Sequence, residues 1–271
     1  MPRLEGHLEL VCAADAAGRS FFRRQSFSAP FHLSKPYWDG HVLVTQIANP
    51  TAGLFAGDRL RSDVRVESGA RLHLTSPSAS RVHTMPDGRA EVLQNFHVTG
   101  GAWFEYFPAP LIPQTGSRYR QVTRVTAEAT AELFFVETVA PGRVARGERF
   151  AFSEIDWEVE LRLDNRLLAR ERFCLRPDDD SLASWQALYP NAYFVSAWLL
   201  TRRVDAHANA WNAIRAETSR DVTLGFSQVA PGLWSIKFLA ADGVSTTNAL
   251  AAIRRGLSSS IPELRCSARK L

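Results

Sequence analysis

The segment Ile155-Asp156-Trp157-Glu158-Val159-Glu160-Leu161-Arg162-Leu163 decides the fold, because apolar and charged residues alternate along its whole length. A period of two is typical of a half-buried strand, with apolar side chains on one face and charged side chains on the other. Asp164-Asn165 then offers a turn, and residues 167–175 can return beside the first strand. This stretch therefore predicts a β-hairpin in a sheet that has one buried face.

The same alternation recurs over roughly the first 200 residues. Further predicted strands cover residues 4–12 and 21–27, which read as an opening hairpin across residues 15–18, and residues 70–74, 92–98, 103–107 and 125–135. No segment with helical periodicity separates these strands, so we predict a mainly β fold with a large antiparallel or coiled β body rather than an α/β fold. No repeat of fixed length is visible, which argues against a regular solenoid.

The pattern changes in the last quarter of the chain. A helix is predicted at 206–218 after an Asp205 cap, and two strands, 222–226 and 233–239, are predicted on either side of the Pro231-Gly232 turn. A second helix, which Ser245 caps and which ends before Pro262, carries Leu250, Ile253 and Leu257 on one stripe. We therefore predict a single domain over residues 1–271, with the β body at about 1–200 and a small C-terminal α+β portion at about 201–271.

Charge and hydropathy exclude several classes of protein. The formal net charge is +4, and the basic residues are almost all arginine, since only Lys35, Lys237 and Lys270 are lysines. The arginines are dispersed among acidic residues, so we expect no nucleic-acid partner. The longest apolar stretch, residues 192–200, is shorter than the roughly 20 residues that a membrane span needs.

The cysteines indicate a reducing compartment. Cys12, Cys174 and Cys266 are far apart and form no C-x-x-C pair, so a disulfide framework or a zinc ribbon is not expected. The first residues lack the apolar core of a secretory signal. These features together predict a cytoplasmic protein.

The sequence contains no recognisable catalytic motif. There is no nucleophile elbow, no phosphate-binding loop and no H-x-x-H pair of metal-binding histidines. Four carboxylates lie beside predicted loops or strand ends: Asp58, Glu105, Glu137 and Glu148. Two of them facing each other in a cleft would suit a hydrolase or an isomerase, whereas arginine-paired carboxylates would be structural. The residues alone leave both readings open.

Five blocks, in one order along the chain, resemble the UreD family of urease accessory proteins, also called UreH. The blocks are NPTAGLFAGDRL at 49–60, LTSPSASRVH at 74–83, FEYFPAPLIP at 104–113, GRVARGERF at 142–150, and the strand 231–239 followed by a helix. The chain departs from the family pattern at Thr51, Ala52, Ala56, Pro77, Ser78 and His83. The departures indicate a divergent member.

The resemblance implies a scaffold rather than an enzyme. Family members resemble scaffolds that bind apo-urease together with the accessory proteins UreF and UreG, of which UreG is a GTPase. The resemblance implies that this assembly delivers nickel to the dinuclear site of urease. They are thought to conduct nickel through an internal passage, with no tightly bound cofactor. On this basis we expect UreF, UreG and apo-urease as partners, and neither a nucleic acid nor a membrane.

The resemblance also suggests which residues serve the passage. Exchangeable oxygen ligands suit a metal in transit better than a thiolate cage, so Asp58 and Glu148 are the first candidates to meet nickel transiently, with Glu105 and Glu137 second. Gly53, Gly57, Gly142 and Gly147 are expected to shape the neighbouring loops. Arg143 is expected to hold a carboxylate through a bidentate pair. The alternative is that Asp58, Arg143 and Glu148 form a structural ion-pair network.

Overall fold

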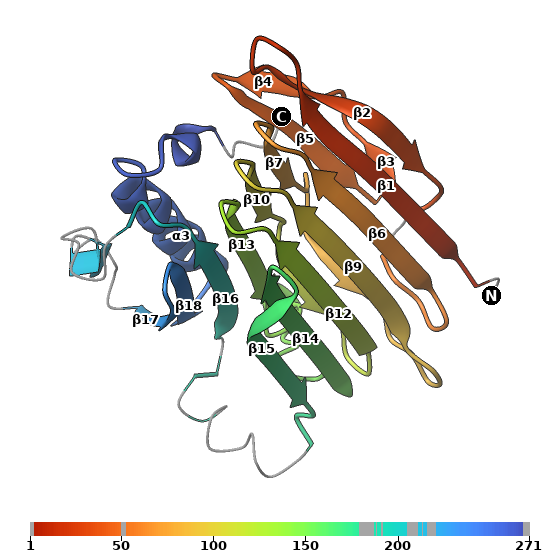
Figure 1. The fold of residues 1–271 in the computed structure, drawn as a ribbon. Helices are drawn as coiled ribbons and strands as arrows, with labels where there is room; N and C mark the ends of the chain where they lie inside the picture. The colour runs from red at the N-terminus through yellow and green to blue at the C-terminus, as the bar shows by residue number, and fades with distance from the viewer. Residues whose placement is uncertain are drawn as a thin grey trace.

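The computed structural model describes residues 3–49, 53–178, 187, 189–190, 192–204, 211–212, 214–215 and 221–267. Within these ranges the chain forms two β-sheets (Figure 1). Sheet I has the order β15 (Arg166–Leu175), β14 (Glu154–Leu163), β12 (Arg118–Ala127), β9 (Ala90–Val98), β6 (Arg59–Val66), β1 (Glu5–Ala14) and β2 (Ser20–Phe27).

Sheet II is the larger one. Its main order is β17 (Val222–Ala230), β18 (Leu233–Ala240), β16 (Tyr193–Leu200), β13 (Glu132–Val139), β10 (Trp103–Phe107), β7 (Arg71–Thr75), β5 (Val42–Ala48) and β3 (His32–Leu33). The short strands β4 (Tyr37–Asp39), β8 (Ser80–Val82) and β11 (Leu111–Pro113) join it at the side. The mainly β fold that the alternation predicts is confirmed.

The centre of the body is a coil of parallel strands. The chain passes from one sheet to the other at each turn, so that β6, β9, β12 and β14 are parallel neighbours in sheet I, while β7, β10 and β13 are parallel neighbours in sheet II. The strands predicted at 92–98 and 103–107 thus lie in opposite sheets. A parallel pair needs a long connection, and here a strand of the other sheet supplies it.

The coil corrects the expectation that a solenoid is absent. Successive strands of sheet I begin at residues 59, 90, 118 and 154, so the structure does turn about once every 30 residues. The turns differ in length and share no repeated sequence, and self-similarity therefore does not reveal them.

Antiparallel pairing is confined to the sides of the coil. The predicted hairpins are confirmed: β1 pairs with β2, β14 with β15, and β17 with β18. Asp164 and Asn165 both adopt positive φ angles, 46° and 65°, which suit the twist of a two-residue hairpin turn.

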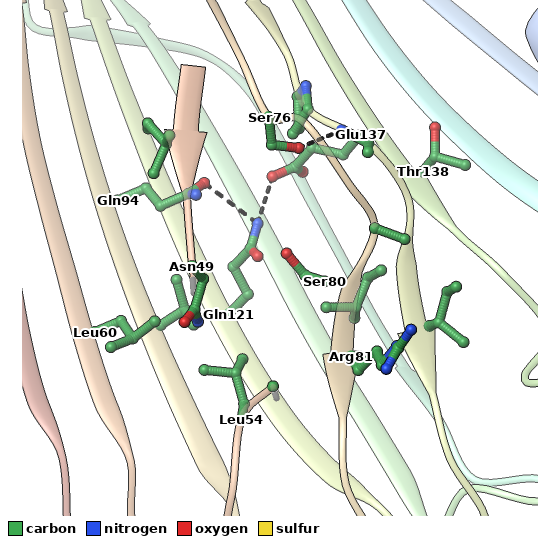
Figure 2. A pocket seen from close by; sticks show the side chains of 18 of the residues that line it. Asn49, Leu54, Leu60, Ser76, Ser80, Arg81, Gln94, Gln121, Glu137 and Thr138 are labelled. Carbon is green, nitrogen blue, oxygen red and sulfur yellow. Dashed lines mark hydrogen bonds between the residues drawn. The ribbon is translucent and has the colours of Figure 1, made fainter. Parts of the chain in front are cut away.

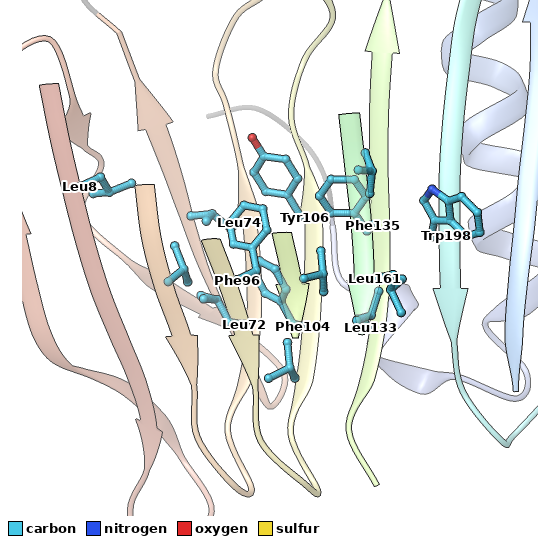
Figure 3. Close-up of a cluster of buried hydrophobic side chains, with 14 of the residues drawn as sticks. Leu8, Leu72, Leu74, Phe96, Phe104, Tyr106, Leu133, Phe135, Leu161 and Trp198 are labelled. Carbon is cyan, nitrogen blue, oxygen red and sulfur yellow. The ribbon is translucent and has the colours of Figure 1, made fainter. Parts of the chain in front are cut away.

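The main core lies between the two sheets and is rich in aromatic rings. Phe96 from sheet I packs against Phe104, Tyr106 and Phe135 from sheet II, with ring centroids 4.9–6.0 Å apart (Figure 3). Leucines and valines that alternate with charged residues complete this core. The burial of these faces is the main force that holds the two sheets together.

The C-terminal portion covers the outer face of sheet II. Helix α3 (Gly243–Leu257) buries Leu250, Ile253 and Leu257, as the helical spacing predicts. Its N-cap is Asp242 rather than Ser245, because the Asp242 carboxylate accepts the Ser245 backbone N–H at 2.7 Å. The predicted helix 206–218 falls largely outside the described residues. No described helix has the length and hydropathy to cross a bilayer.

A buried ion-pair cluster attaches this helix to sheet II. The Glu105 carboxylate on β10 accepts a 2.7 Å hydrogen bond from Nδ1 of His73 on β7. The same carboxylate pairs with the Arg254 guanidinium of α3. Arg254 also donates to the carbonyl oxygens of Leu264 and Cys266. Burial, followed by the nearby Arg254 charge, lowers the pKa of His73 to about 3, so this imidazole is neutral.

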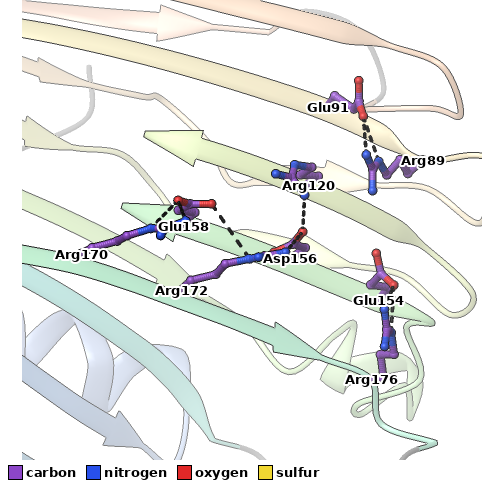
Figure 4. Close-up of polar contacts among 9 residues, drawn as sticks. All are labelled: Arg89, Glu91, Arg120, Glu154, Asp156, Glu158, Arg170, Arg172 and Arg176. Atoms are coloured by element: carbon purple, nitrogen blue, oxygen red, sulfur yellow. Dashed lines mark hydrogen bonds and ion pairs between the residues drawn. The ribbon is translucent and has the colours of Figure 1, made fainter. Parts of the chain in front are cut away.

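Arginine–carboxylate pairs line the outer face of sheet I (Figure 4). Asp156 of β14 is buried beneath Arg120 and Arg172, and Glu158 is buried beneath Arg170. Hydrogen bonding to Arg172 holds the pKa of Asp156 below its usual value. Much of the positive charge in the sequence is thus neutralised by carboxylates of the same sheet.

We expect Glu105→Ala to destabilise the protein by about 3–5 kcal/mol, because Arg254 would remain buried without its partner. Urea unfolding followed by circular dichroism measures this change. Glu154→Ala is the control, since its pair with Arg176 is exposed and should cost less than about 1 kcal/mol. Equal effects of the two substitutions would contradict the anchoring role of Glu105.

Candidate functional site

A cavity of about 380 Å³, lined by both apolar and polar side chains, interrupts the core between the sheets. Its polar wall includes Gln94, Gln121 and Glu137, and residues 76–81 and 108–112 also line it. Figure 2 shows the Gln121 amide between the Gln94 amide and the Glu137 carboxylate. Among the described lining residues, Glu137 is the one carboxylate and Arg81 the one cationic side chain.

The register of sheet I brings polar residues of distant segments to one level. Ser62 is paired with Gln94, Gln94 with Thr123, Thr123 with Val159, and Val159 with Glu171. Paired residues of adjacent strands share a face of the sheet. The inward polar side chains therefore form one row across β6, β9, β12 and β15.

Sheet II places a second row opposite the first. Glu137 of β13 is paired with Ser196 of β16, Ser196 with Lys237 of β18, and Lys237 with Gly225 of β17. We call the two rows together the polar layer; its polar members are Ser62, Gln94, Thr123, Glu171, Glu137, Ser196 and Lys237. The layer crosses the body between apolar residues on either side.

Glu137 lies at the centre of the polar layer and is almost fully buried. Its Oε1 accepts hydrogen bonds from the Gln121 amide and, at 3.4 Å, from the Thr123 hydroxyl, and its Oε2 accepts Trp157 Nε1–H at 2.6 Å. Burial outweighs these three donors and raises the pKa of Glu137 to about 8. A large part of the Glu137 population is therefore protonated at neutral pH.

The donors around Glu137 are themselves held in place. Tyr119 donates its hydroxyl to Gln121 Oε1 at 2.6 Å, and Thr123 donates to Gln94 Oε1 at 3.0 Å. The Gln94 amide donates in turn to the Tyr106 hydroxyl at 2.8 Å. This chain of hydrogen bonds fixes the orientation of each amide, so these side chains do not fold into the cavity.

A second, small cavity adjoins Glu137 on the other side. It has a volume of about 10 Å³, enough for about one water molecule. Glu137 and Trp157 line both cavities, while Glu171 and Ser196 line the small one only. The Lys237 ammonium lies 2.6 Å from Glu171 Oε2 and also contacts the Ser196 hydroxyl. A chain of polar groups thus leads from the large cavity past Glu137 to Lys237.

Of the four carboxylates that the sequence singles out, the structure places only Glu137 in a cavity wall. Asp58 accepts the backbone N–H of Phe55 at 2.8 Å and of Leu4 at 3.2 Å, so it holds a turn. Glu148 forms a bidentate pair with Arg143, which lowers the pKa of its carboxyl. Glu105 faces the C-terminal helix, away from the cavity.

The four glycines lie in tight loops. All have positive φ angles: Gly53, Gly57, Gly142 and Gly147. A Cβ on Gly53 would lie 2.6 Å from the carbonyl oxygen of Arg81, and one on Gly142 would lie 2.7 Å from that of Glu148. Gly53 itself lines the large cavity. Two departures from the family pattern, Thr51 and Ala52, lie outside the described residues.

The histidines of the described part of the chain do not form a metal site. His73 lies under helix α3, His83 stacks on Phe55 with centroids 4.4 Å apart, and His97 pairs with Glu128. Among the described residues, no group of three or more His, Cys, Asp or Glu side chains is arranged to hold a metal ion.

Sequence reasoning missed most of the polar layer. Gln94 and Thr123 occupy inward positions of alternating strands, where the neighbours two residues away include Val92, Phe96 and Val125. The signal that identifies them is a polar residue at a strand position where the period-two pattern expects an apolar residue. Lys237 and Ser196 break the alternation of their strands in the same way.

Glu137→Gln should change how stability depends on pH. Because the folded-state pKa of Glu137 is raised, native Glu137 keeps a proton that the unfolded chain has lost, and wild-type stability falls as pH rises from about 5 to 8. The glutamine variant does not titrate at this position, so its stability does not fall for this reason as the pH rises. Its stability relative to wild type should rise by up to about 1 kcal/mol per pH unit in this window, measured by urea unfolding.

Glu148→Gln is the matched control for that experiment. The pKa of Glu148 is lowered, so the stability it contributes is complete above its unfolded-state pKa and is lost only as the pH falls through its folded-state pKa. Its difference from wild type should be constant between pH 5 and 8. A flat difference for Glu137→Gln as well would show that Glu137 is ionised in the native protein.

Comparison with known proteins identifies the family. The model of the UreD urease accessory protein family matches residues 4–268. The chain is 44% identical to urease accessory protein UreD of Opitutus terrae over 271 residues, which cover 98% of each chain. It is 31% identical to UreD of Herpetosiphon aurantiacus over 99% of this chain and 90% of that protein. The chain belongs to the UreD family of urease accessory proteins.

Proposed function

We propose that this protein is a non-catalytic scaffold of urease maturation and that nickel in transit passes through its polar layer. Family membership supports the role in urease maturation. The observation that carries the route is the position of Glu137, a buried carboxylate in the wall of both cavities. Nickel is the cargo in this proposal, and the protein holds no resident metal.

The chemistry of the polar layer suits transit better than storage. Its ligands toward a cation are amide, hydroxyl and carboxylate oxygens, with no thiolate or imidazole among the described lining residues of either cavity. Oxygen ligands of this kind bind nickel more weakly than nitrogen or sulfur ligands and allow exchange. The single carboxyl group that the described residues contribute to the large cavity, Glu137, can pair with a dication that displaces its proton, and it does not enclose the ion.

The first two candidates from the resemblance have structural contacts instead. Asp58 is bonded to backbone N–H groups and Glu148 to Arg143, and neither lines a cavity. We propose that these two residues and the four glycines shape the loops at the edge of the body, while Glu137 and Glu171 contact the metal.

A hydrolase or isomerase is less well supported. The large cavity contains one carboxylate and no histidine or cysteine among its described lining residues, so it lacks an acid–base pair. Glu137 and Glu171 do line one common space, but its volume of about 10 Å³ excludes an organic substrate. The geometry therefore favours passage of a small ion.

The partners in this proposal are UreF, UreG and apo-urease in the cytoplasm. We expect the protein to co-purify with UreF when the two are co-expressed, because scaffolding requires a stable complex. Affinity pull-down followed by size-exclusion chromatography measures this. Absence of a complex at micromolar concentration would contradict the scaffold role.

We expect Glu137→Gln to reduce nickel loading of urease by about tenfold or more, since an arriving cation can displace the carboxyl proton of Glu137 and pair with the carboxylate, whereas the amide has the same shape but stays neutral. The measurements are urease activity and the nickel content of purified urease after activation by the complete accessory complex. The UreF complex should form as with wild type.

Glu160→Gln is the control for nickel loading, because Glu160 lies on the outer face of sheet I and lines neither cavity. It should load urease normally. Full nickel loading by Glu137→Gln, at equal amounts of the accessory complex, would overturn the proposed route.

A further inference from the structure

Lys237 occupies the end of the polar layer near β17. Its ammonium donates to Glu171 Oε2 at 2.6 Å and contacts the Ser196 hydroxyl, which itself donates to the same Glu171 oxygen at 2.7 Å. The ammonium also lies 4.2 Å from the centre of the Trp198 ring. It is a compact cation that all three neighbours stabilise.

The groups that hold Lys237 are the same groups that a cation would meet after Glu137. Glu171 and Ser196 line the small cavity together with Glu137. Ser196 is also the cross-strand neighbour of both Glu137 and Lys237. The ammonium therefore occupies the next set of oxygen ligands along the row.

The row is open beyond Lys237. The next residue in register is Gly225 on β17, which has no side chain, and a Cβ placed there would meet no atom within 4 Å. The side chains of Lys237 and Glu171 are 28% and 23% exposed. Solvent thus reaches this end of the polar layer, whereas Glu137 is sealed from it.

We infer that Lys237 is a displaceable latch: its ammonium fills the cation position on Glu171 and Ser196, and a divalent cation arriving from Glu137 displaces it. This inference rests on the proposed route and adds its regulation at one end. In the absence of metal the latch neutralises Glu171, so this end of the row does not attract cations from solvent.

Simple electrostatics supports the exchange. A divalent ion interacts with the Glu171 oxygens about twice as strongly as an ammonium at the same distance. The displaced ammonium stays tethered by a flexible four-carbon stem and can turn into the open space beside Gly225. The exchange therefore moves one side chain and requires no change in the backbone of either sheet.

A purely structural role for Lys237 predicts different results for thermal stability and metal affinity. In that case the Lys237–Glu171 pair would only join β18 to β15 across the gap between the sheets. Its removal would lower thermal stability and leave metal affinity unchanged. Measuring both quantities on the same variants separates the two roles.

The test is calorimetric titration of Ni²⁺ into the untagged full-length protein and its variants at pH 7.5. Lys237→Gln removes the competing charge, and we expect it to bind Ni²⁺ about tenfold more tightly than wild type. Lys237→Arg keeps the charge and should bind as wild type does. Adding Glu171→Gln to Lys237→Gln should abolish the gain.

A Lys237→Gln affinity within twofold of wild type would overturn the latch, and so would absence of Ni²⁺ binding by both proteins. The proposed route is judged separately by nickel loading of urease with Glu137→Gln. Loss of loading in that variant, with no effect of Lys237→Gln on affinity, would leave the route standing and remove the latch.

Gly225→Val tests the opening without touching Glu171 or Lys237. Valine suits a strand and has free space at this position, so we expect the variant to fold as wild type. Its side chain would fill the space into which the ammonium moves. We expect slower Ni²⁺ binding in stopped-flow measurements, and an unchanged association rate would contradict the predicted path of the ammonium.

Discussion

Parallel register between strands that lie about 30 residues apart is the constraint on which the polar layer depends. Each turn of the coil returns the chain to the same level of sheet I, so one polar residue per turn is sufficient to build the row, which only Val159 of β14 interrupts. A slip of one residue in one of these strands would send its polar side chain to the outer face and bring side chains of the outer face, such as Arg124 of β12, into the core. The cavity and the arginine–carboxylate pairs of the outer face therefore fix the same register from opposite sides.

A polar row inside an apolar core is costly unless its groups are hydrogen-bonded. The amides of Gln94 and Gln121 satisfy this requirement by bonding to each other and to two tyrosine hydroxyls. The aromatic cluster around Phe96 borders the row and keeps the rest of the core dry. Glu137 is the member whose charged form is not compensated, as its raised pKa shows. The proposed route therefore passes the one group of the network for which burial disfavours the charged form.

Alternation along single strands was sufficient to predict the mainly β fold, the three hairpins and the apolar stripe of helix α3. It could not predict that 92–98 and 103–107 lie in opposite sheets, because both arrangements bury the same faces. The family blocks pointed to loops such as those holding Asp58 and Glu148, where glycines and short contacts constrain the backbone. The cavity residues lie mostly in strands whose sequence looks ordinary, and only their level in the sheet brings Ser62, Gln94 and Thr123 together.

Two cations among the described residues, the buried Arg254 and the half-buried Lys237, show how the surroundings distinguish a structural ion pair from the proposed exchangeable one. Arg254 and Lys237 each pair with a glutamate, but Arg254 also donates to two backbone carbonyls and is buried between helix α3, to which it belongs, and sheet II. A guanidinium held by several fixed acceptors cannot leave without exposing all of them, so it anchors the helix. Lys237 has a single charged partner, a flexible stem and open space beside it. The Arg254–Glu105 pair is therefore permanent, whereas the Lys237–Glu171 pair is the proposed exchangeable one. The two pairs differ because Arg254 has more fixed partners than Lys237 and Lys237 has free space beside it.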